Sequence, residues 1–169
     1  AMKDKKGYGR IYRITPKGKK LKTPEFDFHS TAGLINALKS PAINVRALGF
    51  EGLRTKGEAV VPEVRQLLMA ENPYHQARAI WLLAQLGDTG NAEVVKLLTS
   101  ANAAHRLAAF RALKSTGKAN AYLEQMSKDP DPAVRRELAE VQQRGEVVAT
   151  RKASQQAIAR LAPRLPELL

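Results

Sequence analysis

The chain has 169 residues and no cysteine, and aromatic residues make up only 5% of it. The lack of cysteine excludes disulfide bonds and thiolate zinc sites within these residues. The three histidines, His29, His75 and His105, share no His-x-x-x-His or Glu-x-x-His spacing, so we expect no metal site. No apolar run approaches the roughly 20 residues that a helix needs to cross a bilayer. Hydrophobic residues still make up 44% of the chain, mostly Leu, Ala and Val, which predicts an aliphatic core.

The chain also lacks a recognisable catalytic pattern. Its carboxylates are scattered over predicted helix starts and turns, as at Glu58, Asp88 and Asp131, where negative charge complements the helix dipole without any catalytic role. Gly7 and Gly9 have neither the spacing nor the following helix of a phosphate-binding loop. We therefore predict no catalytic residue and no cofactor, and we expect that this chain itself is not an enzyme.

Positive charge is concentrated at the beginning of the chain. The net charge is +12, and residues 1–22 contribute +8 of it, with nine Lys or Arg against Asp4. The remaining 147 residues carry nineteen basic and fifteen acidic side chains, so the pattern does not indicate a uniformly cationic nucleic-acid groove. This basic segment at the start of the chain either binds anions or is a solvated linker. Its candidate anion-binding residues are Lys17, Lys19, Lys20 and Lys22.

Residues 1–29 form this basic leader. Residues 7–15 alternate β-branched and aromatic residues with others, which is typical of a strand, and a strand needs a partner to be stable. It either pairs with an edge elsewhere or is the remnant of a preceding domain. Pro16 and Gly18 then predict a turn and an extended linker. The first two residues, Ala-Met, look like the remnant of an expression vector.

From Ser30 onward the chain is an internal repeat with a period of about thirty residues. Each unit contains a candidate helix cap, an arginine follows the cap six positions later, and a glycine closes the unit. Proline follows three of the four caps, and at the first helical position it costs no hydrogen bond. Repeats with a period of roughly 20–50 residues form solenoids, in which each unit packs against its neighbours. The caps, arginines and glycines are, in this order, Ser40, Asn72, Ser100 and Asp129; Arg46, Arg78, Arg106 and Arg135; and Gly57, Gly87, Gly117 and Gly145.

Each unit is predicted to hold two helices, the second of which starts at the cap. The array of these units covers residues 30–145. Residues 146–169 follow it as a terminal helix or as a truncated fifth repeat. The predicted pairs are 31–39 with 41–56, 60–70 with 73–86, 91–99 with 101–116, and 119–127 with 130–144.

The four arginines and the single tryptophan each allow two interpretations. The arginines could form a row of cations for acidic partners, but their shared repeat position favours hydrogen bonds to the carbonyls or cap of the adjacent unit. Trp81 could line a nucleic-acid-binding groove, but it lies between Ile80 and Leu82 on the most apolar helix, which favours core packing. His75 and His105 are expected to be exposed in the first turns of their helices.

Residues 72–88, with their cap, proline, arginine and Leu-Gly pair, resemble the short HEAT-like repeats of the bilin-lyase type. The resemblance covers about 115 of the 169 residues. The third unit lacks the proline, and the fourth has Gln-Arg-Gly in place of Leu-Gly. The resemblance implies an all-α fold, a right-handed α-solenoid of about four HEAT-like helix pairs plus a terminal helix, with a short N-terminal strand or extended leader.

A second resemblance concerns residues 9–18. This segment, Gly-Arg-Ile-Tyr-Arg-Ile-Thr-Pro-Lys-Gly, looks like the last strand of a β-propeller in large bacterial proteins of the membrane-bound dehydrogenase or haem-binding type. In those proteins a HEAT-like array and then a c-type haem module follow the propeller. The resemblance implies that the chain is the middle segment of an exported redox protein, either periplasmic or membrane-associated.

These observations favour a non-catalytic scaffold or protein-interaction module of a larger multidomain bacterial protein. Its partner would be another protein or a neighbouring domain of the same polypeptide. The alternative is a nucleic-acid-binding protein of the HEAT-like DNA-repair glycosylase class, which the +12 charge suggests. A third option, an accessory of bilin or cofactor lyases, rests on family analogy alone.

Overall fold

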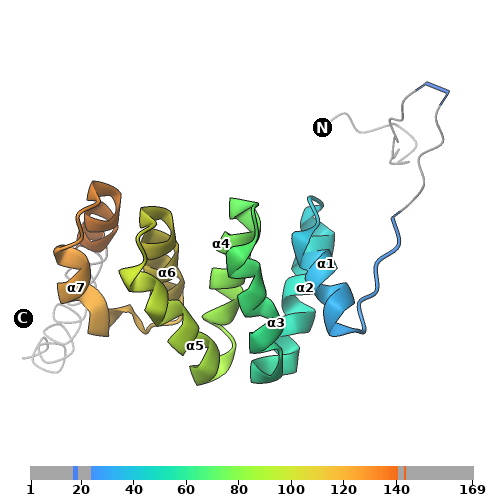
Figure 1. Cartoon of the computed structure of the whole chain (residues 1–169), viewed down its shortest axis with the longest axis horizontal. Coiled ribbons are helices and arrows are strands. Elements are labelled where there is room, and N and C mark those ends of the chain that lie inside the picture. Colours follow the sequence, from blue (N-terminus) through green and yellow to red (C-terminus); the bar gives the residue numbers. More distant parts are fainter. Residues whose placement is uncertain (1–16, 19–23, 141–142, 144–169) are drawn as a thin grey trace, which may run out of the picture.

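The computed structural model describes residues 17–18, 24–140 and 143, and in these ranges all regular elements are helices (Figure 1). The α-helices are α1 (Thr31–Lys39), α2 (Ile43–Lys56), α3 (Val61–Gln66), α4 (Pro73–Leu83), α5 (Gly87–Lys96), α6 (Ala103–Ser115) and α7 (Leu123–Ser127). Residues 132–140 are helical as well. Short 3-10 helices extend three of these elements: η1 (Gly57–Val60) and η2 (Leu67–Met69) flank α3, η3 (Leu97–Thr99) follows α5, and η4 (Ala119–Tyr122) precedes α7. The strand predicted for residues 7–15 lies outside the described residues.

The helices form successive pairs that stack side by side along the long axis of the molecule (Figure 1). The second helices of the four pairs are α2, α4, α6 and the helix over residues 132–140. They begin at residues 43, 73, 103 and 132, which are thirty, thirty and twenty-nine residues apart. The prediction of about four stacked helix pairs with a period of about thirty residues is therefore confirmed.

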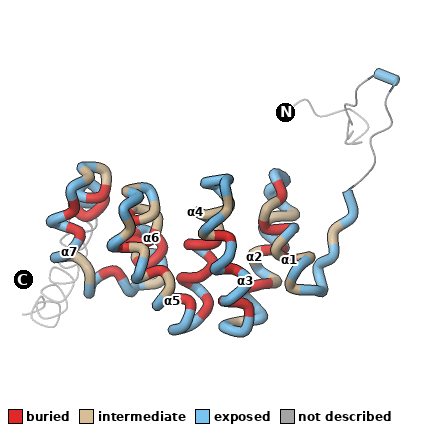
Figure 2. The backbone as a smooth tube through the Cα atoms, in the orientation of Figure 1, coloured by how far each residue is buried: buried red, intermediate tan, exposed pale blue. Residues whose placement is uncertain are grey.

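The core is an aliphatic seam that runs through the whole stack (Figure 2). Buried side chains from all four units belong to one cluster, and most of them come from the apolar faces of the helices. Full burial of one Val, Leu, Ile, Phe or Met side chain stabilises the fold by roughly 1.5–3 kcal/mol. The largest fully buried residues are Leu34, Leu38, Leu53, Val64, Ile80, Leu82, Leu83, Leu86, Val94, Phe110, Leu113 and Met126.

The second helices start differently from the prediction in three of the four units. Asn72 does cap α4: its side chain accepts a hydrogen bond from the Tyr74 N–H, and Pro73 is the first helical residue. Ser40 is not a cap, because Ala42 holds the N-cap position of α2. The Ser40 hydroxyl instead accepts a hydrogen bond from the Ala42 N–H at 3.2 Å.

Ser100 and Asp129 also lie two residues before the true caps. Asn102 caps α6, and its Oδ1 accepts a hydrogen bond from the Ala104 N–H at 2.9 Å. Asp131 has the same role at the last helix. Ser100 and Asp129 accept hydrogen bonds from the backbone N–H groups of Asn102 and Asp131, respectively. The predicted caps therefore hold the turn that leads into the helix, a role that the same side chains often have.

The observed helix starts also change which arginines hold equivalent positions in the repeat. Counted from these starts, Arg46, Arg106 and Arg135 are equivalent, and each donates from Nη1 to two carbonyl groups of the turn before its own helix. Gln76 holds this position in the second unit and donates to the Ala70 carbonyl at 2.6 Å. The equivalent arginines thus bond carbonyl groups as expected, but those of their own unit. Arg78 lies two positions further along its helix.

Polar side chains tie the third and fourth units together. Arg106 forms a second set of bonds, with Nε and Nη2 donating to the two carboxylate oxygens of Asp129 at 2.7 and 2.9 Å. Glu137, in the last helix, accepts hydrogen bonds from Arg111 and Lys114 of α6. Contacts of this kind between neighbouring units are typical of repeat architectures, in which each unit contacts only those beside it.

Candidate functional site

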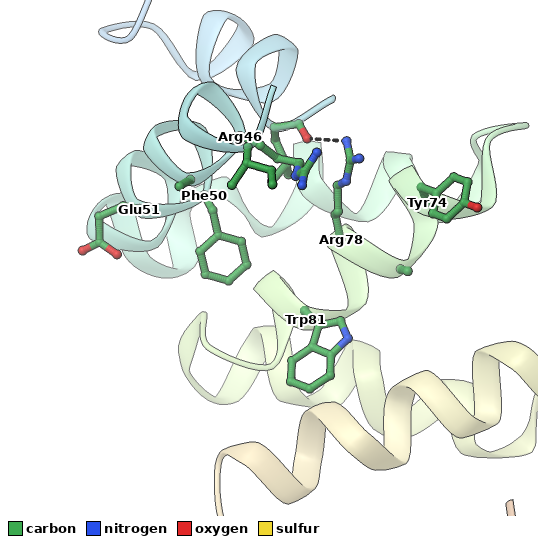
Figure 3. Close-up of a pocket in the computed structure, with 10 residues that line it drawn as sticks. Arg46, Phe50, Glu51, Tyr74, Arg78 and Trp81 are labelled. Atoms are coloured by element: carbon green, nitrogen blue, oxygen red, sulfur yellow. Dashed lines mark hydrogen bonds between the residues drawn. The ribbon is translucent and has the colours of Figure 1, made fainter. Parts of the chain in front are cut away.

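A groove of about 740 Å³ opens between α2 and α4, the second helices of the first two units (Figure 3). Two stripes of side chains face each other across it, each with the spacing i, i+3, i+4, i+7 that places residues on one side of a helix. The stripe of α2 consists of Ile43, Arg46, Ala47 and Phe50. The stripe of α4 consists of Tyr74, Ala77, Arg78 and Trp81. Together with Leu38 and Glu51, these residues line what we call the α2–α4 groove.

The groove opens because α4 carries bulky side chains on the side that faces α2. Counted from the helix starts, Tyr74 and Arg78 correspond to Ala104 and Ala108 of α6. Where α6 carries these two small alanines, α6 lies in closer contact with α4 than α4 does with α2. Large side chains at a helix contact increase the distance between the axes.

Phe50 is less buried than its equivalents in the next two units, which indicates looser packing between α2 and α4. Its equivalents in the next two units, Ile80 and Phe110, are fully buried, with an exposed fraction of 0%. Phe50 is only half-buried, because its ring faces the groove and not a closely packed neighbour. The first two units therefore leave apolar surface accessible that the later units bury.

Trp81 lies in the wall of the groove, so its predicted place in the core is wrong. Its exposed fraction is 36%, and those of Ile43 and Tyr74 are 75% and 72%. Ile80 and Leu82, its neighbours in the sequence, are fully buried. Successive side chains on a helix differ in direction by ~100°, so a residue between two buried neighbours can face solvent. The sequence of α4 is apolar on nearly all sides, so its apolar periodicity alone does not indicate which face stays open.

Arg46 and Arg78 place two guanidinium groups close to each other beside the apolar walls (Figure 3). Arg78 Nη1 donates to the Leu38 carbonyl at 2.9 Å, and both arginines donate to the Ser40 carbonyl. Partial burial, followed by the nearby charge of Arg46, lowers the pKa of Arg78 from its usual value. Guanidinium groups nevertheless remain protonated in proteins. The groove therefore combines apolar walls with two positive charges.

Glu51 is the acidic residue of the lining, but its charge is already paired. Arg54, one turn further along α2, donates from Nε to Glu51 Oε2 at 2.9 Å. This hydrogen bond lowers the pKa of Glu51. In Figure 3 the carboxylate points away from Arg46 and Arg78. Glu51 consequently does not neutralise the two arginines of the groove.

Three other predicted site residues lie away from the α2–α4 groove. Ser100, Arg106 and Asp129 come together at a smaller hollow of about 280 Å³ between the third and fourth units, where they bond one another and the backbone. Lys17, in the leader, is exposed. The other three leader lysines lie outside the described residues.

The described residues contain no group of three His, Cys, Asp or Glu side chains that could hold a metal ion. His105, expected to be exposed, is half-buried, and its Nε2 lies 2.7 Å from Gln76 Oε1. This hydrogen bond connects α6 with α4 and gives the histidine a role in packing between units.

Residues 61–141, from α3 to the last helix, match the family model of HEAT repeats. The chain contains HEAT-like repeats. The predicted fold class, an all-α HEAT-like solenoid, is confirmed, and the pair formed by α1 and α2 continues the same stack in front of the matched residues. A comparison with curated proteins found no match. None of the helices in the described ranges has the length and apolar composition of a membrane span.

HEAT repeats commonly act as scaffolds for protein–protein interaction and are typically non-catalytic. The α2–α4 groove lies where the matched repeats meet the first pair. This groove was not predicted from the sequence, although the residues of both stripes have helical spacing. A stripe that joins arginine with aromatic residues is unusual for a buried helix face, and this composition could have indicated an accessible surface.

Proposed function

We propose that this chain is a non-catalytic scaffold or protein-interaction module, and that a protein partner binds in the α2–α4 groove of its HEAT-like solenoid. The observation that carries this proposal is the exposure of Ile43, Tyr74 and Trp81 along one groove. Contiguous exposed apolar surface with a polar rim marks interaction sites in soluble proteins. Extended surfaces built from stacked helix pairs are also the usual binding surfaces of solenoids.

The residue types in the groove support the same proposal. Trp, Tyr and Arg are enriched among the few interface residues that carry most of the binding energy. The groove contains Trp81 and Tyr74 together with two arginines. Aromatic side chains supply a large contact area and lose little conformational entropy on binding. A partner segment that enters the groove would therefore bury Ile43 and Tyr74, the two most exposed large apolar side chains of the described second helices.

Selection of displayed peptides tests this proposal. The immobilised full-length chain is offered a phage library of random twelve-residue peptides, and the enriched peptides are then synthesised for binding measurements. We expect peptides that bind the wild-type chain reproducibly. If repeated selection enriches no peptide, the proposed interaction function is contradicted.

Two pairs of variants then locate the bound peptide. Ile43→Ala and Tyr74→Ala shorten exposed groove side chains and should weaken binding by about fivefold or more, as expected for residues that contribute to an interface. Leu48→Ala and Met69→Ala shorten side chains that are also exposed but lie outside the groove. These two control variants should bind like the wild type.

We also propose that the chain belongs to a larger multidomain bacterial protein, with a leader (1–29), the repeat array (30–145) and a terminal segment (146–169). The strand-like pattern of residues 9–18 supports this origin, because it is similar to the end of a β-propeller. The parent would then be an exported protein of the membrane-bound dehydrogenase or haem-binding type. Genomic sequence on both sides tests this: propeller repeats upstream and Cys-x-x-Cys-His downstream are expected, and other neighbours would contradict it.

The charge of the repeats does not favour the nucleic-acid alternative. Residues 24–140 contain fourteen Lys or Arg and thirteen Asp or Glu, a net charge of only +1. Non-specific affinity for nucleic acid depends on clustered cations that neutralise several phosphates. Most of the excess positive charge belongs, in the sequence, to residues 1–22 and to residues 141–169.

A further inference from the structure

The two arginines of the α2–α4 groove use only part of their hydrogen-bonding capacity. Their bonds to the Leu38, Ser40 and Pro41 carbonyls all start from Nη1. Among the described residues, their Nε and Nη2 groups donate no hydrogen bond. A guanidinium offers five N–H donors in a planar fork that matches a carboxylate. The groove therefore presents donors in the geometry that suits an acidic group.

The charge around these donors is not balanced within the groove. Arg46 and Arg78 lie close to each other, and Glu51 is already paired with Arg54. Burial and the proximity of Arg46 lower the pKa of Arg78, as expected when two like charges share a partly desolvated site. A negative group from outside would relieve this repulsion and accept the remaining donors.

The size of the groove limits how the binding groups of a partner are spaced. Ile43 and Phe50 are seven residues apart on α2, and so are Tyr74 and Trp81 on α4, which corresponds to about 10 Å along each helix. This length fits about two turns of a bound helix or three residues of an extended chain. An apolar side chain and an acidic one in the same groove must therefore be close in the partner's sequence.

We propose that the α2–α4 groove binds a protein segment in which an Asp or Glu lies within four residues of a large apolar side chain. The carboxylate pairs with Arg46 and Arg78, and the apolar side chain packs between Phe50 and Trp81. This inference rests on the proposed interaction function and specifies the chemistry of the partner. Two adjacent cations suit one carboxylate, whereas single-stranded nucleic acid requires a groove whose positive charges follow several phosphates.

Trp81 provides the readout, because it is the only tryptophan of the chain and lies in the wall of the groove. The probes are the enriched twelve-residue peptides that lack tryptophan, and copies in which Asn or Gln replaces every Asp or Glu. We expect the enriched peptides to contain an acidic residue within four positions of Phe, Leu, Ile or Met. In titrations of Trp81 fluorescence, the acidic peptides should bind about tenfold more tightly than their amide copies.

Arg78→Gln should weaken binding of the acidic peptides about tenfold and leave binding of the amide copies unchanged. Arg65→Gln is the matched control, because it removes an exposed charge outside the groove and should alter neither affinity. Arg78 also bonds the Leu38 carbonyl, so a second measurement uses the wild-type chain alone. Raising NaCl from about 50 mM to about 500 mM should weaken the binding of the acidic peptides and leave the binding of the amide copies unchanged.

The outcomes separate this inference from the proposed function. Equal affinities for acidic peptides and amide copies would overturn acid recognition and leave the interaction function in place. Acidic peptides that bind Ile43→Ala and Tyr74→Ala as tightly as wild type would overturn this inference and also the α2–α4 groove as the binding site, because they bind elsewhere. If a twelve-nucleotide oligothymidine changes the Trp81 fluorescence more than any peptide does, the inference is overturned in favour of nucleic acid. Failure to enrich any peptide would overturn both proposals.

Discussion

At the level of single residues, Asp129 is where the third and fourth units meet. Its carboxylate accepts hydrogen bonds from Arg106 Nε at 2.7 Å and Nη2 at 2.9 Å, and from the Asp131 N–H at 2.8 Å. The side chain is only 3% exposed. The hydrogen bonds from Arg106 lower the pKa of Asp129 below 3.8, although burial alone would raise it. The ionised carboxylate therefore stabilises the folded state above pH 3.8, and this contribution is lost as the pH falls through the lowered pKa.

Asp129→Asn should lower the free energy of unfolding at pH 7 by roughly 1–3 kcal/mol, because Arg106 loses its buried counter-charge. Below pH 3.8 the difference from wild type should shrink, since the wild-type carboxylate becomes protonated and asparagine does not titrate. Urea unfolding at several pH values measures both effects. Glu140→Gln changes an exposed carboxylate and serves as the control. A difference that does not vary with pH would contradict an ionised pair.

At the level of elements, the start of α5 is held by the preceding unit. Glu58 accepts hydrogen bonds from the Asp88 N–H at 2.8 Å and from the Thr89 hydroxyl at 2.6 Å. A carboxylate at a helix N-terminus satisfies unpaired N–H groups and complements the helix dipole. Gly87 approaches this carboxylate with a φ of +69°, and a Cβ at Gly87 would overlap it. Glycine therefore suits position 87, at the junction between the second and third units, both because its φ is positive and because a Cβ would overlap the Glu58 carboxylate.

Gly87→Ala should destabilise the protein more than Gly117→Ala. Both glycines have positive φ, so alanine costs about 1–2 kcal/mol at either position, but a Cβ at Gly117 meets no atom within 4 Å. The additional cost at Gly87 should decrease when Glu58→Ala removes the overlapping carboxylate. A double-mutant cycle in urea measures this coupling. If both glycine variants cost the same in the wild-type and Glu58→Ala backgrounds, the overlap does not affect stability.

For the whole molecule, stability depends on the contacts between neighbouring units. The helix α4 lies in the middle of the stack and contacts α1 and α2 on one side and α6 on the other. Leu83, near its end, is fully buried and belongs to the common core. A cavity at this position weakens packing in the centre of the array, where both neighbours depend on it.

Leu83→Ala should lower the free energy of unfolding by ~2–5 kcal/mol, as expected for a buried large-to-small change. Leu48→Ala is the matched control, because Leu48 is 57% exposed and its truncation should change stability by no more than about 0.5 kcal/mol. Thermal or urea unfolding of the two variants provides the comparison. An unchanged melting temperature for Leu83→Ala would show that Leu83 does not contribute to the core.

The predicted helices follow the observed ones closely, because helix formation depends on patterns within a few turns. The prediction of 73–86 corresponds to α4, and that of 60–70 to α3 with its 3-10 helices. The caps were less predictable, since Ser and Asp oxygens hold both turns and helix starts. Because of this ambiguity, the predicted caps Ser100 and Asp129 lie two residues before the true caps. For the same reason, the prediction assigns Arg78 to the repeat position that Gln76 holds.

The stacked helix pairs were evident from the chain itself, because apolar periodicity and a spacing of about thirty residues both depend on residues near one another in sequence. The α2–α4 groove was not. Its width depends on Tyr74 and Arg78 standing where α6 carries Ala104 and Ala108, and on how these side chains meet α2. A distance between two helices results from the side chains of both at once, so no single stretch of sequence contains it.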